Sequence, residues 1–266
     1  MSADFLGTID WHRPWLKPLR TAADPVIRAA DWRLALNSAV AAAGLRNHRG
    51  LPVRFVLQSE LPAGVAYEAF ISATGGVPTR DNLHDFFNAL VWLTFPRTKV
   101  QLNALQAAEI ARLEAARDTA GQVRGRIRDA ATIFDENAAL LVTADDQLAS
   151  ALRAHCWKSV FIDRRNAFWS RNDILLFGHA LMEKLVTPYK AITAHTRVLT
   201  APDSYFSLSE SERLAWVDAE MSRQLRSGLD TSGFMHLPIA GVPGWWEGQD
   251  ATFYADANVF RPSRRR

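Results

Sequence analysis

The chain has 266 residues, of which 48% are hydrophobic and 22% are charged. The length suits one large domain, and the composition excludes a wholly disordered chain. The formal net charge is only +3, and Arg264, Arg265 and Arg266 at the end of the sequence account for all of it. Charge alone therefore indicates no general nucleic-acid-binding surface.

The sequence carries no recognisable signal for export or membrane insertion. The first five residues lack a basic region followed by an apolar run, so we expect no signal peptide. No window approaches the ~20 apolar residues that span a bilayer. Cys156 is the only cysteine, which rules out an intramolecular disulfide and fits a reducing compartment. We expect a cytoplasmic protein that does not enter the membrane.

The N-terminal part of the chain is predicted to contain one helix and two strands. Residues 1–30 are expected to form an extended segment, because prolines interrupt them. A helix is predicted over 31–43, with apolar residues spaced for one face and Gly44 as its end. Strands are predicted over 53–57 and 67–72, from their content of aromatic and β-branched residues.

Helices alternate with short strands in the rest of the prediction. Asp81 or Asn82 is expected to cap a helix that ends before Pro96. The other predicted elements are a loop over 74–78, a helix over 99–119 that Gly121 ends, a β-hairpin with strands 131–134 and 139–142, a helix over 146–157, a strand over 159–162, and helices over 174–186 and 209–227. The predicted fold class is α/β or α+β. It is a helix-rich single domain over residues 1–266 with a small mixed sheet and an irregular Pro-, Gly- and aromatic-rich tail over 235–266, packed on the body.

Three segments share their residues with a known family. They are Gly-Val-Pro-Thr-Arg-Asp-Asn-Leu-His-Asp-Phe-Phe-Asn-Ala-Leu over 76–90, Arg-Asp-Ala-Ala-Thr-Ile-Phe-Asp-Glu-Asn over 128–137, and Phe-Gly-His-Ala-Leu-Met-Glu-Lys over 177–184. With the tail segments 241–246 and 259–262, they resemble a bacterial family known as domain of unknown function 3025. The resemblance covers nearly the whole chain and implies one domain, but it brings no activity with it.

The first candidate site lies around the start of the helix near Asn82. His84 and Asn88 are one helical turn apart and share a face. Arg80 precedes the helix, where backbone N–H groups also attract anions. We therefore consider Arg80 an anion clamp, His84 an acid/base or metal ligand, and Asp85 its orienting partner or a second ligand. In the alternative interpretation these residues are the solvated face of a helix, and Arg80 pairs with Asp81 or Asp85.

A second candidate site pairs His179 with Glu183, again one helical turn apart. If His84 and His179 converge with Asp85 or Glu183, they form a two-histidine, one-carboxylate set suited to a divalent metal such as iron, manganese or zinc. The pattern lacks the full His-Glu-x-x-His motif of zinc proteases. A simple charge pair between His179 and Glu183 is the other interpretation.

Further charged residues have weaker patterns. Asp135 and Glu136 are interpreted as residues of a hairpin turn, and His195 as an edge or core imidazole. Lys99 and Arg128 are candidate substrate-binding cations. Together with Arg124 and Arg126, Arg128 also gives a small basic footprint for nucleic acid.

Motifs for nicotinamide binding, nucleoside-triphosphate hydrolysis, serine-hydrolase chemistry and cysteine-bound zinc do not occur. The leading hypothesis is a hydrolase-type enzyme, metal-assisted, acting on a phosphate- or carboxylate-bearing substrate. The alternative is a non-catalytic protein that binds a small anionic ligand, nucleic acid or a protein partner.

Overall fold

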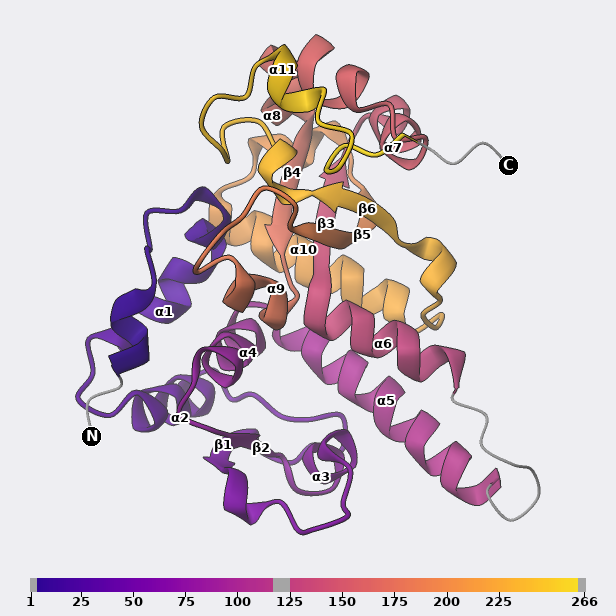
Figure 1. The fold of residues 1–266 in the computed structure, drawn as a ribbon. Coiled ribbons are helices and arrows are strands. Elements are labelled where there is room, and N and C mark those ends of the chain that lie inside the picture. Colours follow the sequence, from indigo (N-terminus) through magenta and orange to yellow (C-terminus); the bar gives the residue numbers. More distant parts are fainter. Residues whose placement is uncertain (1–3, 117–124, 263–266) are drawn as a thin grey trace. The chain divides into compact units, whose positions relative to one another are not determined.

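The computed structural model describes residues 4–116 and 125–262. The protein is helix-rich, with a small mixed sheet and an irregular C-terminal segment, as the sequence predicted (Figure 1). It consists of two compact units, each assembled from segments that are distant in sequence. The first comprises Met1–Ile9, Pro18–Ile133 and Leu214–Thr231, and the second comprises Asp10–Lys17, Phe134–Arg213 and Ser232–Arg266. The single-domain organisation stays a prediction.

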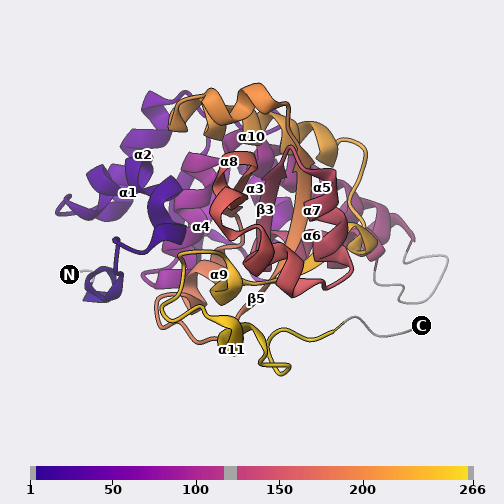
Figure 2. The same ribbon diagram turned by 90° about the horizontal axis from the view of Figure 1, so that it is seen from above.

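The first unit contains mostly helices. Its elements, in chain order, are α1 (Arg20–Ile27), α2 (Trp32–Ala42), β1 (Arg54–Leu57), α3 (Tyr67–Thr74), β2 (Gly76–Thr79), α4 (Leu83–Thr94), α5 (Pro96–Ala116), most of α6 (Arg126–Asn137) and most of α10 (Glu210–Leu225). Helices α1 and α2 lie side by side in both views (Figures 1 and 2). Strands β1 and β2 are parallel neighbours. The segment that was expected to be extended therefore contains helix α1, and also 3-10 helices at Asp4–Thr8 and Pro14–Leu19.

Local capping residues place two helices of this unit where the sequence predicted them. The Asp31 carboxylate accepts a hydrogen bond from the backbone N–H of Leu34 and begins α2. The Asn82 side chain accepts one from the backbone N–H of Asp85, 2.8 Å away, and begins α4. Helix α4 ends at Thr94, before Pro96, as predicted.

The second unit is organised around a four-stranded mixed sheet. Its elements are the end of α6, β3 (Ala138–Thr143), α7 (Asp146–Arg153), α8 (Phe168–Arg171), β4 (Asn172–Leu176), α9 (His179–Lys184), β5 (Thr193–Thr200), β6 (Met235–Pro238) and α11 (Ala251–Tyr254). The strand order is β4-β3-β5-β6 (Figure 1). β3 runs antiparallel to β4 and parallel to β5, and β5 runs antiparallel to β6. All six residues of β3 are buried, as expected for a central strand that is covered on both faces.

The predicted β-hairpin over 131–142 is wrong in its first half. Residues 131–137 belong to helix α6, and only the second half, β3, is a strand. Ala130, Ala131 and Phe134 are buried at helical spacing, so they form one face of α6. β3 pairs with β4 and β5, which lie more than 25 residues away in sequence. The local pattern therefore could not identify its partners.

Two apolar runs were assigned to the wrong type of element. Residues 67–72, predicted as a strand, form helix α3, which ends at Gly75 with a positive φ of 74°. The start of the predicted helix 174–186 is strand β4, and α9 begins only at His179. A short continuous apolar run fits a buried strand and a buried helix equally well, and the tertiary neighbours decide between them.

Smaller differences concern element ends and loops. The predicted loop 74–78 contains most of strand β2, and the predicted strand 159–162 is a turn of π-helix over Ser159–Asp163. The predicted helix 146–157 stops at Arg153. α10 confirms the predicted helix 209–227. The expected helix end at Gly121 lies outside the described residues.

None of the helices in the described part of the chain combines the length and the apolar character that crossing a bilayer requires.

Candidate functional site

Arg80 and Asp85 form a two-point ion pair at the start of α4 in the first unit. The Nε and Nη2 atoms of Arg80 each donate to the Asp85 carboxylate at 2.9 Å, and the backbone N–H of Arg80 donates to it at 2.6 Å. The side chain of Asp85 is only 8% exposed, whereas that of Arg80 is 56% exposed. The pairing of Arg80 with Asp85 that the sequence offered as an alternative is therefore present.

The electrostatic state of Asp85 follows from this pairing. Burial raises the pKa of the Asp85 carboxyl, but the hydrogen bonds and the charge of Arg80 outweigh it, with a smaller contribution from His84, and hold the pKa below its ordinary value. Asp85 is thus an ionised carboxylate at neutral pH. Arg80 donates to it from two side-chain nitrogens and from its backbone N–H.

Asn88 belongs to a buried polar network in the same unit. Its side-chain amide donates to the Tyr67 hydroxyl at 3.0 Å and accepts from the Lys99 ammonium at 2.8 Å. Lys99 is only 4% exposed, and its Nζ lies 5.4 Å from the centre of the Trp92 ring. Lys99 therefore carries a positive charge into the interior of the unit, where its interaction with an aromatic face is favourable.

His179 occupies the first position of α9 in the second unit, directly after Gly178. A Cβ atom on Gly178 would lie 2.4 Å from the Ala138 backbone nitrogen and 2.6 Å from two backbone atoms of Asn137. Only glycine allows this close approach of two backbone segments. Gly178 thereby brings the start of α9 against the end of α6, and the His179 side chain is buried there.

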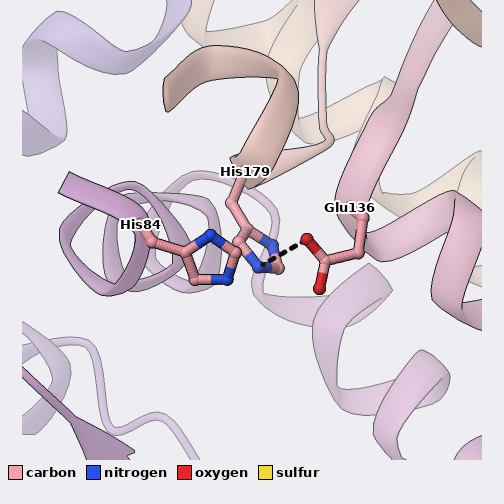
Figure 3. Close-up of side chains that lie close together, drawn as sticks. All are labelled: His84, Glu136 and His179. Carbon is pink, nitrogen blue, oxygen red and sulfur yellow. Dashed lines mark ion pairs between the residues drawn. The ribbon is translucent and has the colours of Figure 1, made fainter. Parts of the chain in front are cut away.

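Each ring nitrogen of His179 faces a carboxylate from the end of α6. Nε2 lies 3.5 Å from Oε2 of Glu136 (Figure 3). Nδ1 lies 3.9 Å from Oδ1 of Asp135. The His179 side chain is 5% exposed, that of Asp135 16% and that of Glu136 40%. A buried imidazole with a carboxylate near each nitrogen is stable as a proton-sharing group or as a metal ligand.

The distance between His179 and Glu136 fits joint coordination of one ion. The 3.5 Å between Nε2 and Oε2 is longer than a good hydrogen bond. Two ligand atoms at tetrahedral positions around zinc, with bonds of about 2.1 Å, lie about 3.4 Å apart. The pair is therefore spaced as two ligands of one metal ion would be.

The other predicted site residues lie on separate elements. His84 is on α4 in the first unit and is partly exposed. Glu183 is on α9, in the last turn of that helix. Arg128 is exposed near the start of α6, Arg126 is its first residue, and Arg124 lies outside the described residues. The expectation that His84, His179 and Glu183 bind one metal stays a prediction.

Sequence reasoning missed Glu136 as a partner of His179. Asp135 and Glu136 were interpreted as a hairpin turn, but they lie in the last turn of α6 and both approach His179. One signal pointed to them: the acidic pair and His179 both belong to segments through which the family resemblance was recognised. Sequence separation concealed their proximity, because the strand pairing of β3 with β4 brings the segments together.

The comparison with protein families gives one result. A family model described as protein of unknown function, DUF3025, matches residues 53–264. The chain belongs to this family. The matched region contains β1 and β2, the Arg80–Asp85 pair and all four strands of the mixed sheet in this DUF3025 protein. No curated protein and no solved structure gave a significant match.

Proposed function

We propose that this DUF3025 protein is a metal-assisted hydrolase that acts on a small phosphate- or carboxylate-bearing substrate. The observation that carries the proposal is the buried imidazole of His179, whose Nε2 is 3.5 Å from Glu136 and whose Nδ1 faces Asp135. Histidines that bind metals use one ring nitrogen for the ion, and the other commonly donates to a carboxylate. In this proposal Glu136 is a second ligand of the ion beside Nε2, and Asp135 is the carboxylate that faces the other ring nitrogen.

In this proposal Nε2 of His179 and Oε2 of Glu136 bind a divalent cation. Asp135 faces Nδ1 and favours the tautomer in which Nδ1 carries the proton, and in this tautomer Nε2 offers a lone pair to the cation. His84, the second imidazole that the sequence predicted, belongs to the first unit and stays a prediction. Glu136 takes the carboxylate position that the sequence analysis assigned to Glu183.

An imidazole and a carboxylate leave coordination positions for water and substrate. A bound divalent ion lowers the pKa of water and polarises the bond that is attacked, which is the chemistry of metal-dependent hydrolysis. Arg128, exposed near the start of α6 in the first unit, stays a predicted cation for the anionic group of a substrate. Lys99, the other predicted cation, is buried in the first unit and also stays a prediction. A cytoplasmic setting is part of the proposal, and cell fractionation tests it.

Metal content tests the ligands directly. The full chain, purified without a histidine tag and dialysed against Zn²⁺ or Mn²⁺, is expected to hold about one ion per chain, measured by mass spectrometry. His179→Ala and Glu136→Gln should each lower metal affinity by about 100-fold or more, because each removes a direct ligand. His48→Gln is the matched control, since His48 bonds Ser72 in the first unit.

The outcomes separate the parts of the proposal. Equal metal in wild type and His84→Ala would remove His84 as a ligand, and equal metal in all variants would overturn the site. Hydrolysis of p-nitrophenyl phosphate or p-nitrophenyl acetate is expected to disappear with a chelator and to return with the ion. A protein that binds metal stoichiometrically and hydrolyses neither ester would contradict the enzymatic part.

A further inference from the structure

A pocket lies entirely within the second unit, and neither His179 nor Glu136 lines it. It has a volume of about 860 Å³ and is lined by the turn after α7, the start of β5, β6 and the C-terminal segment up to Pro262. This volume is in the range of small-molecule binding pockets. The described lining residues include Arg261, His155 and His236 but no acidic side chain. The pocket is therefore suited to a negatively charged ligand.

His155 has an unusual backbone for a residue with a side chain. Its φ is +56°, and it is the only non-glycine residue with positive φ in the described chain. It follows the end of α7, where the backbone N–H of Cys156 bonds the Ala151 carbonyl at 2.9 Å. This is the helix-ending turn that normally carries glycine. His155 therefore has a backbone conformation that usually requires glycine, and strained residues of this kind are concentrated at functional sites.

The imidazole of His155 is held flat against one wall of the pocket. It stacks on the Trp157 ring with centroids 4.8 Å apart and planes 25° apart. Its Nδ1 donates to the Arg261 carbonyl at 3.2 Å, because a carbonyl oxygen can only accept. Nδ1 therefore carries a proton. The stacked pair offers a planar aromatic surface to a ligand.

Arg261 is fixed at the pocket through its backbone and its side chain. Its carbonyl also accepts from Nε1 of Trp157 at 2.7 Å, and its own Nε donates to the Asn258 carbonyl at 3.1 Å. These contacts anchor the residue beside His155. Its guanidinium brings a permanent positive charge to a pocket whose described lining residues carry no carboxylate.

A pair of histidines across β5 and β6 extends the same face. His195 and His236 are register partners, with ring centroids 5.4 Å apart. The Asn137 amide nitrogen donates to the Thr193 carbonyl at 3.1 Å and lies 3.0 Å from Nδ1 of His195. Because Thr193 fixes the amide orientation, Nδ1 of His195 accepts, and Nε2 carries the proton when the ring is neutral. His195 is thus a donor that favours an anion over a metal ion.

We propose that this pocket binds a small molecule with a planar aromatic ring and a phosphate group, of the size of a mononucleotide. Arg261 and His236 contact the phosphate, and the ring packs against the His155–Trp157 stack. The proposal does not depend on metal binding by His179, because it uses none of the same residues.

Titration calorimetry with AMP, GMP, CMP and UMP, on the full chain in the presence of EDTA, tests the proposal. At least one mononucleotide should saturate with a dissociation constant below about 1 mM. It should bind at least about tenfold more tightly than its nucleoside, which lacks the phosphate, and than inorganic phosphate, which lacks the aromatic ring. Arg261→Gln and His236→Gln should each weaken binding by about tenfold. Arg171→Gln, at an exposed ion pair with Asp203 in the same unit, should leave it unchanged.

His155→Gly separates binding from folding. Glycine is favoured at this backbone position, so the variant should melt at the wild-type temperature or higher while binding the mononucleotide about tenfold more weakly. Failure of every mononucleotide to saturate, equal affinity for the nucleoside, or unchanged affinity in both Arg261→Gln and His236→Gln would overturn the proposal. Chelator-sensitive binding of Zn²⁺ by His195 and His236 in place of nucleotide would overturn it as well.

Discussion

A single buried carboxylate, Asp85, illustrates how side chains fix local structure in this protein. It accepts one backbone and two side-chain hydrogen bonds from Arg80, which precedes α4, while Asn82 caps the same helix. The segment from Arg80 to the first turn of α4 is therefore held by charge and by capping together. His84 lies within this turn, so the geometry of the pair also sets the position of the proposed metal ligand.

Asp85→Asn should lower the free energy of unfolding by about 1.5–3 kcal/mol at pH 7, because charge-assisted hydrogen bonds to a buried group are lost. The pKa of Asp85 is lowered in the fold by the hydrogen bonds and charge of Arg80, which outweigh burial. Its contribution is therefore fully present above the unfolded value of about 3.9 and is lost as pH falls through the lower folded pKa. Urea unfolding at pH 7 and pH 3 measures this.

Asp81→Asn serves as the comparison, since Asp81 is 65% exposed in its ion pair with Arg33. It should cost less than about 1 kcal/mol at either pH. An equal loss in the two variants, or a loss in Asp85→Asn that does not shrink in acid, would contradict the assignment.

Gly178 is the second residue whose role can be tested alone. Gly178→Ala places a methyl group against backbone atoms of Asn137 and Ala138 at 2.4–2.6 Å, and backbone atoms cannot move aside as a flexible side chain can. We expect a loss of about 2–4 kcal/mol in unfolding free energy, in the range of overpacked core sites. Gly7→Ala, where no atom lies within 4 Å, is the control and should change stability little. Thermal and urea unfolding of both variants give the comparison.

At the scale of elements, the start of α5 depends on a side chain from α10. The Asp218 carboxylate accepts from the backbone N–H groups of Arg97 and Thr98 at 3.0 and 2.8 Å, and from the Thr98 hydroxyl at 2.7 Å. Pro96 at the first position of α5 has no N–H to satisfy. Asp218 therefore caps α5 from a distant part of the sequence, within the first unit, although burial raises its pKa despite these bonds.

Asp218→Ala should destabilise the protein by about 2–3 kcal/mol, because two buried N–H groups and one hydroxyl lose their acceptor. Asp218→Asn keeps one side-chain oxygen and should cost clearly less. Urea denaturation with circular dichroism measures both. Equal stability of Asp218→Ala and wild type would show that solvent replaces the cap without cost.

At the scale of the whole molecule, the C-terminal segment is ordered by one amide side chain within the second unit. Gln249 donates to the carbonyls of Ala240 and Val242, each at 2.7 Å. It accepts from the backbone N–H of Gly244 at 2.9 Å and from Arg165 at 2.7 Å. Gln249 thus holds the loop around Gly244 in place, and the C-terminal segment that follows it supplies one side of the proposed nucleotide pocket.

Gln249→Ala should increase the hydrogen-exchange rate of the Gly244 amide by about tenfold or more, since its acceptor is removed and the loop around it loses three further bonds. Gln147→Ala is the control, because Gln147 makes an exposed contact with Arg164. Exchange followed by mass spectrometry distinguishes the two. An unchanged exchange rate at Gly244 would contradict this prediction and would indicate that aromatic packing, and not Gln249, orders the C-terminal segment.

The sequence by itself determined the helices that local signals define. α2, α4 and α10 carry their own caps and apolar spacing, and these act within a few residues. It also indicated the helix-rich class with a small sheet and the polar cluster at Arg80 and Asp85. It named His179 as a candidate metal ligand. The tertiary structure decided the rest. β3 and β4 are strands because they pair with each other across more than 25 residues, and α3 is a helix although its residues favour a strand.

The same distinction holds for the candidate site. The pairing of His179 with Glu136 depends on Gly178 meeting the backbone at the end of α6, a contact between segments about 40 residues apart. The i, i+4 spacing along one helix pairs His179 with Glu183, because this rule applies only to residues that are close in sequence. The free energy of burial and strand pairing acts between neighbours in space, and in this protein it brings Glu136 to His179.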